Sequence, residues 1–230
     1  AMCTPNRQCP LLNGTSEMAS SKSRASTGSI VTTVSAGGID AAVAVILNLA
    51  VSDYGSFCIG GEVPFMFYSV NTGKVRVFNG MGGAPGDPKA IETFYSEGIP
   101  EEMSGIKVST VPSALSTILK ALEVNGTMSF EQIVRPTLEL LDKGGESWYH
   151  NLAMTFRKLI DTEKSTRGTR AEKVKAARDR FYKGDIADEL DKYYVSSGAY
   201  LRKSDLEAHT TLIEDPVTVR YRGYDIYKCN

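Results

Sequence analysis

The chain has 230 residues, of which 42% are apolar and 23% are charged, so it is long enough to bury a sizeable core. Because 26 basic residues nearly balance 27 acidic ones and no basic face stands out, the sequence predicts no nucleic-acid partner. No apolar run approaches the ~20 residues that cross a bilayer. We therefore expect no membrane span and a soluble chain, either cytoplasmic or exported after loss of a leader.

Residues of the types that bind metals are too scattered to predict a metal site. The four cysteines fit neither a zinc pattern nor a disulfide framework, and the two histidines lie far apart without a partner at ligand spacing. These residues are Cys3, Cys9, Cys58, Cys229, His150 and His209.

The first elements follow a polar start. Residues 1–28 are rich in Ser, Thr, Asn and Pro, which is typical of a flexible arm. The run "GGIDAAVAVILNLAV" is apolar on nearly every face, which predicts a buried helix with Asp40 as its N-cap or first-turn acid.

A β-hairpin is predicted next, because "FMFYSV" and "KVRVFN" are joined by the turn signal "NTG". Since "FMFYSV" is apolar on both faces, we expect this strand inside a sheet that is covered on both sides. Glycines flank the hairpin at both ends. Glycine weakens strands and is placed where the backbone turns sharply or comes close to another group.

Helical signals dominate from residue 112, and we expect a helical lobe at about 112–210. "PSALSTILKALEVNG" places Pro112 in a first turn and ends at Asn125–Gly126, while "SFEQIVRPTLELLDKGG" opens with Ser129 and Gln132 as a capping box. Charged and apolar residues alternate at helical spacing over 150–195, as in surface helices. A further helix is expected to be capped at Ser204.

The chain closes on two alternating strands in "PVTVRYRGYDIYKC", which turn at Arg222–Gly223. The sequence contains no obvious partner for these strands.

Several of these stretches, in the same order, resemble the large-subunit region of the gamma-glutamyltranspeptidase family. In that family a glycine pair precedes an "AVDAAVA"-like helix, and a "GIGG" turn and a hairpin that ends in Ala-Pro follow it. The segments "VSTVPSALSTILKALEVNGTMSFEQIVRPTLELLDKG", "SGAYLRKSDLEAH" and "VRYRGYDIY" are similar to later parts of the same region. The resemblance runs over roughly residues 29–228.

The resemblance implies an α/β (α+β) fold, the four-layer αββα sandwich of N-terminal-nucleophile hydrolases, with residues 29–230 as the large-subunit region. It implies a zymogen that cleaves itself, after which the N-terminal threonine of a second, small subunit attacks an amide carbonyl. The α-amino group of that threonine can serve as the base for its hydroxyl, so no histidine and no cofactor are required. The expected partners are therefore the small subunit and a small amide or gamma-glutamyl-type substrate.

None of the residues of this chain is expected to be catalytic, because the sequence stops before the nucleophile of the family would appear. Thr210–Thr211 superficially resembles a nucleophile region, but it lies within a continuing match. The chain is expected to supply a wall of the acyl pocket. The candidate substrate-binding residues are Gly60, Gly61, Glu62, Met81, Gly82 and Gly83.

In this interpretation the glycines leave room for an acyl group and expose backbone amides; the alternative is that they are ordinary strand-end and bulge glycines. Glu62 could orient a substrate amine, although a glutamate beside a turn is usually solvated. The gamma-glutamyl enzymes of the family carry an arginine that binds the α-carboxylate of the donor, and alignment on Ala84–Pro85 puts Met81 there. A thioether cannot pair with a carboxylate.

The acyl specificity is therefore predicted to differ from gamma-glutamyl, unless Arg76 or a residue of the second chain substitutes. Met81 favours a more apolar or differently charged acyl group, as in acylase members of the family; alternatively, Met81 packs in the core. A separate hypothesis is a non-catalytic scaffold or binding protein that retains the fold without the nucleophile.

Overall fold

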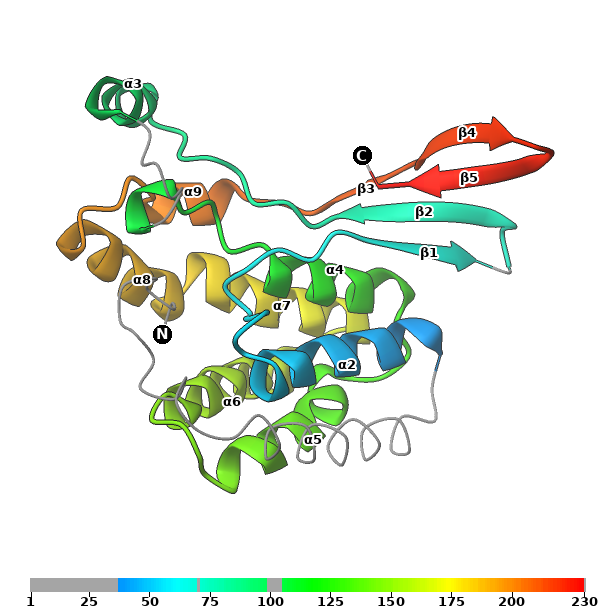
Figure 1. Ribbon diagram of the computed structural model, residues 1–230. Coiled ribbons are helices and arrows are strands. Elements are labelled where there is room, and N and C mark those ends of the chain that lie inside the picture. The colour runs from blue at the N-terminus through cyan, green and yellow to red at the C-terminus, as the bar shows by residue number, and fades with distance from the viewer. Residues whose placement is uncertain (1–36, 70, 99–104, 230) are drawn as a thin grey trace, which may run out of the picture.

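The computed structural model describes residues 37–69, 71–98 and 105–229. The predicted flexible arm at 1–28 lies outside the described residues. In Figure 1 a group of helices fills one side of the molecule, a three-stranded sheet lies along it, and a separate hairpin extends away from the helices.

Helices form around one hydrophobic core, which includes Leu47, Leu119, Phe156 and Tyr182. Neighbouring pairs pack along this core: α4 on α7, α5 on α6, α6 on α7, and α2 on both α4 and α5. The helices are α2 (Gly38–Ser52), α4 (Ala114–Asn125), α5 (Phe130–Asp142), α6 (Tyr149–Ser165), α7 (Arg170–Lys183), α8 (Asp185–Ser196) and α9 (Lys203–Ala208). The other helical elements of the described residues are α3 (Pro88–Glu97) and the short 3-10 helix η1 (Ile106–Val108).

Helix α4 is the central element, since every residue from 111 to 119 is buried. Its run of Ala, Leu and Ile leaves no polar face for water, as expected for a buried helix. The helix begins after the N-cap Ser113, so Pro112 precedes the helix and does not lie in its first turn as predicted. Gly126 caps its C-terminal end, as the sequence indicated.

Asp40 lies in the first turn of α2, where a first-turn acid was predicted, while Gly37 is the N-cap. The side chain is fully buried. It accepts hydrogen bonds from the Thr127 amide (3.0 Å), the Thr127 hydroxyl (2.8 Å) and the Met128 amide (3.1 Å). Asp40 thus joins α2 to the connection between α4 and α5, which is a structural role.

Two predicted caps had different outcomes. The capping box of Ser129 and Gln132 is confirmed at the start of α5. The cap at Ser204 is wrong, because α9 begins after Arg202, whose backbone amide donates to Asp205 at 2.8 Å. Ser204 is therefore an exposed residue of the first turn.

The predicted hairpin is confirmed: β1 (Phe65–Ser69) and β2 (Lys74–Asn79) pair antiparallel, and Gly73 turns between them with φ +64°. A strand that the sequence did not indicate, β3 (Leu212–Glu214), pairs with the other edge of β2. Strand β1 therefore lies at the edge of the sheet, and Met66 and Tyr68 are 38% and 61% exposed. In the described part of the chain β1 is covered on one face only, unlike the expectation.

The last two strands, β4 (Val217–Tyr221) and β5 (Tyr224–Lys228), form a second antiparallel hairpin. Its turn, Arg222–Gly223, has φ values of +49° and +88°, as a tight hairpin turn requires. Every residue of both strands is exposed. None of the described helices is long and apolar enough to cross a membrane.

Candidate functional site

Two glycine turns and the start of α4 meet beside the three-stranded sheet; we call residues 58–63, 79–83 and 109–114 the glycine wall. The first turn closes where the Gly61 amide donates to the Cys58 carbonyl at 3.0 Å. The Val63 amide then donates to the Gly80 carbonyl at 3.2 Å, which joins the first turn to the second. The sequence-predicted residues at 60–62 and 81–83 are thus brought together.

The N-terminal end of α4 holds both turns in place. The Gly61 carbonyl accepts from the amides of Ser113 (3.1 Å) and Ala114 (2.8 Å), which have no partner within the helix. The Ser113 hydroxyl donates to the Gly80 carbonyl at 2.5 Å, and the Val111 amide donates to the Gly83 carbonyl at 2.9 Å. The buried start of α4 therefore fixes the backbone of the wall.

Close approach of backbone explains two of the glycines. A Cβ at Gly80 would lie 2.0 Å from the Val63 carbonyl oxygen, and one at Gly82 would lie 2.1 Å from the Val111 carbonyl oxygen. At Gly83, by contrast, a Cβ would meet nothing within 4 Å. None of the glycines of the wall has a positive φ, so space and not backbone conformation demands glycine at 80 and 82.

Glu62 connects the two turns through its side chain. Its Oε1 accepts a hydrogen bond from the Gly82 amide at 2.6 Å and another from the Thr110 hydroxyl at 3.2 Å. The side chain is half-buried and is not simply solvated. The Gly82 amide is consequently occupied, although the sequence analysis expected exposed amides in this turn.

Met81 lies at the surface of the wall and is 49% exposed, so the alternative that it packs in the core is wrong. Its amide donates to the Asn79 side chain at 3.2 Å. Arg76, the cation considered as a substitute for the missing arginine, instead pairs with Asp215 at 2.7 Å.

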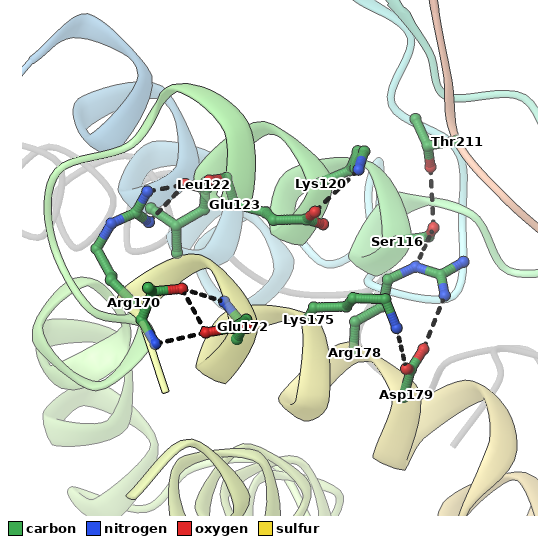
Figure 2. A network of polar contacts seen from close by, with 11 residues as sticks. Ser116, Lys120, Leu122, Glu123, Arg170, Glu172, Lys175, Arg178, Asp179 and Thr211 are labelled. Carbon is green, nitrogen blue, oxygen red and sulfur yellow. Dashed lines mark hydrogen bonds and ion pairs between the residues drawn. The ribbon is translucent and has the colours of Figure 1, made fainter. Parts of the chain in front are cut away.

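A polar network connects α7, α4 and the segment before β3 (Figure 2). Arg178 donates to the Ser116 hydroxyl at 2.9 Å, and Ser116 lies 2.9 Å from the Thr211 hydroxyl. A second guanidinium nitrogen of Arg178 donates to the His209 carbonyl at 2.6 Å. The network fixes the segment that leads into β3, and Thr211 within it is buried.

Two titratable side chains belong to this network. Burial raises the pKa of Tyr182, whose hydroxyl donates to the Pro112 carbonyl at 2.5 Å and accepts from the Ser116 amide at 2.9 Å. Burial, followed by the charge of Arg178, lowers the pKa of His209 below its usual value. Both residues are thereby held neutral near pH 7.

The opposite end of α4 carries a surface pocket of about 280 Å³. It is lined by Ser129, Glu163, Lys164, Arg170 and Lys173. Glu163 already accepts from the amides of Phe130 (2.7 Å) and Glu131 (2.9 Å) at the start of α5. Arg170 binds carbonyls at the end of α4, as Figure 2 shows. Since α4 is about 18 Å long, this pocket is separate from the glycine wall.

His, Cys, Asp and Glu side chains do not gather into a potential metal site anywhere in the described ranges. His150 is exposed on α6 and His209 is half-buried beside the ring of Tyr182, so the structure does not bring the two histidines together at a site.

The fold is that of an N-terminal-nucleophile hydrolase. It is similar to a cephalosporin acylase from Bacillus halodurans, with a TM-score of 0.68 and 20% identity over 90% of this chain and 44% of the other. It is also similar to a gamma-glutamyltranspeptidase from Pseudomonas nitroreducens complexed with L-DON, with a TM-score of 0.65 and 17% identity over 94% and 70% of the two chains.

The chain belongs to the gamma-glutamyltranspeptidase family, whose model matches residues 26–169 and 148–230. A glutathione hydrolase proenzyme from Bacillus subtilis is 26% identical over 215 residues, which are 82% of this chain. The chain spans 37% of the length of that relative. The resemblance found in the sequence is thereby confirmed at the level of family and fold.

Three residues that hold the wall and the neighbouring polar network in place were not predicted from the sequence. Thr110, Ser113 and Arg178 belong to no motif, and their partners lie 48, 33 and 31 residues away in the chain. A small polar residue directly before a buried helix is the only available signal, and it points to Ser113 as an N-cap and not to its contact with Gly80.

Proposed function

We propose that this chain is the large-subunit part of an autoprocessed amide hydrolase or acyltransferase. The observation that carries the proposal is the family match along almost the whole chain, together with relatives that are named proenzymes. The exposed strands support a second chain as partner. Along β4 and β5, Val217, Val219, Tyr221, Tyr224 and Ile226 form one apolar face that the described residues leave uncovered.

In the proposed reaction the N-terminal threonine of the small subunit attacks the carbonyl carbon of an amide, and its own α-amino group accepts the hydroxyl proton. Backbone amides stabilise the oxyanion of the tetrahedral intermediate. The leaving amine takes a proton and departs, and water or a second amine then resolves the acyl-enzyme. No step requires a cofactor.

The glycine wall is proposed to border the acyl group of the substrate. Its first turn contributes Gly60, Gly61 and Glu62, and its second turn contributes Met81, Gly82 and Gly83. The open space at Gly83 and the exposure of Met81 support this role. Because Gly82 donates to Glu62, the oxyanion donors are assigned to other amides. Residues 29–230 are proposed to act as one large-subunit unit, with the helices at about 112–210 as a lobe that supports the wall.

The proposed acyl specificity differs from gamma-glutamyl. Met81 carries no charge, and Arg76 is engaged by Asp215, so neither provides a free cation for an α-carboxylate. Cephalosporin acylase, which is similar in fold, is named for a different acyl substrate.

Expression of the complete reading frame tests the proposal. The purified product should contain two chains, the second of which begins with threonine, and should release aniline from simple acyl anilides. A product that stays in one piece and turns over no acyl or gamma-glutamyl anilide would instead support a non-catalytic scaffold.

A further inference from the structure

Glu62 helps to fix the geometry of the wall, and it is the only residue of the wall that carries a charge. One oxygen of its carboxylate accepts from both Gly82 and Thr110. The other oxygen makes no hydrogen bond within the part of the chain that the structure describes. The residue is half-exposed and lies directly beside the turn that carries Met81.

The charge of Glu62 is not neutralised by its neighbours. Both of its hydrogen-bond donors, a backbone amide and a threonine hydroxyl, are neutral groups. Among the described residues no lysine or arginine forms an ion pair with Glu62, and Arg76, on the strand that leads into the second turn, is held by Asp215. The wall is therefore anionic, and a second carboxylate placed against it is repelled.

We propose that Glu62 sets the acyl specificity of this site: it rejects acyl groups that carry a carboxylate and admits neutral or amine-bearing ones. This inference rests on the proposed function and deepens it. It assigns the discrimination between acyl groups to a residue of this chain. An acyl group with a carboxylate is rejected by repulsion from Glu62, as well as by the absence of a cation that would attract it. An ammonium group on the acyl chain can bind the free oxygen of Glu62 with a charge-assisted hydrogen bond.

Three anilides of the form X–(CH2)3–CO–anilide provide the test, with X as methyl, carboxylate or ammonium: the pentanoyl, glutaryl and 4-aminobutanoyl compounds. The complete two-chain protein is compared with Glu62→Gln. Glutamine keeps an oxygen that can accept from Gly82, so the substitution removes the charge and preserves the wall. Glu139→Gln, an exposed position on α5, is the matched control.

The unmodified protein should favour the pentanoyl and 4-aminobutanoyl compounds over the glutaryl compound. Glu62→Gln should raise the kcat/KM ratio of glutaryl to pentanoyl by about tenfold and lower that of 4-aminobutanoyl to pentanoyl, mainly through KM. Met81→Arg, at an exposed position, should also raise the kcat/KM ratio of glutaryl to pentanoyl. This second variant keeps the proposal testable if the Glu62→Gln protein does not fold. Glu139→Gln should leave both ratios unchanged.

The proposal is overturned if the glutaryl compound is preferred by the unmodified protein, or if Glu62→Gln leaves both ratios within twofold of it. In either case turnover of the three anilides still supports the proposed function. Absence of turnover of every anilide by a protein that does contain an N-terminal threonine overturns both proposals together, which separates the two failures.

Discussion

The hydroxyl of Ser113 donates to the carbonyl oxygen of Gly80 at 2.5 Å, in a buried position at the start of α4. This bond connects the central helix directly to the second glycine turn. Ser113 also donates its amide to Gly61, so one residue contacts both turns of the wall.

Replacement of Ser113 by alanine should lower the free energy of unfolding by about 1–3 kcal/mol, because the Gly80 carbonyl is left buried without this donor. Urea unfolding of the complete protein measures the change. Ser204→Ala, at an exposed position in the first turn of α9, should change stability by less than about 0.5 kcal/mol. Equal effects of the two substitutions would contradict the role of Ser113.

Alanine substitutions along the second glycine turn should have very different effects. Gly80→Ala and Gly82→Ala each force a Cβ against a backbone carbonyl and should cost more than about 3 kcal/mol or prevent folding. Gly83→Ala meets open space at a φ that alanine adopts, and should be neutral within about 0.5 kcal/mol. Yield and thermal unfolding of the three variants decide the matter; a neutral Gly80→Ala or Gly82→Ala would show that the turn packs differently.

Asp40→Asn should destabilise the protein by about 2–4 kcal/mol, since a fully buried carboxylate with donors from Thr127 and Met128 is replaced by an amide that brings its own hydrogens. Denaturant titration provides the value. Asp161→Asn, on the exposed face of α6, is the control and should stay within about 0.5 kcal/mol. A small effect of Asp40→Asn would rule out the proposed link between α2 and the α4–α5 connection.

Stability should decrease between about pH 7.5 and pH 5.5 in a manner that depends on His209. Its pKa in the folded protein lies below the ordinary value of 6.5, so the unfolded chain takes up a proton first as the pH falls. The stability that neutral His209 contributes is present above about pH 6.5 and is lost as the pH falls toward the lower pKa of the folded state.

His209→Gln should therefore flatten the dependence of the unfolding free energy on pH over this range, as urea unfolding at both ends would measure. The Arg178 contact survives the substitution because it uses the backbone carbonyl of residue 209. An unchanged slope in His209→Gln would contradict the assignment.

Local sequence signals predicted the elements whose cause is local. The hairpin turn at 71–73, the capping box of Ser129 and Gln132, and the turn at Arg222–Gly223 each depend on residues within a few positions of one another. The error at Ser204 also concerns neighbouring residues. The N-cap position of α9 is occupied by Arg202 and not by Ser204, and the Arg202 amide donates to Asp205.

Contacts between distant residues could not be predicted in this way. Strand β3 was missed because its three residues form a strand only by pairing with β2, more than a hundred residues earlier. The expectation that β1 is covered on both faces followed from its apolar residues, but its edge position is set by which strands are present beside it. Apolar residues in a strand indicate that its faces are to be buried, but they do not identify the segment that covers each face.

The candidate site shows the same division. Glycine spacing and the resemblance to the family directed attention to residues 60–62 and 81–83, and these residues do meet. The hydrogen bond from the Gly82 amide to Glu62 could not be predicted from the sequence. Because of this bond, the turn does not offer a free Gly82 amide to the substrate, and it lies against the charged side chain of Glu62.

The most direct measurement of the central claim is the intact mass of both chains of the complete protein after brief exposure to a slowly hydrolysed acyl ester. The account predicts that the second chain alone gains the mass of one acyl group, located on its N-terminal threonine. Acylation of the chain described above, or no acylation of either chain despite a free N-terminal threonine, would contradict it.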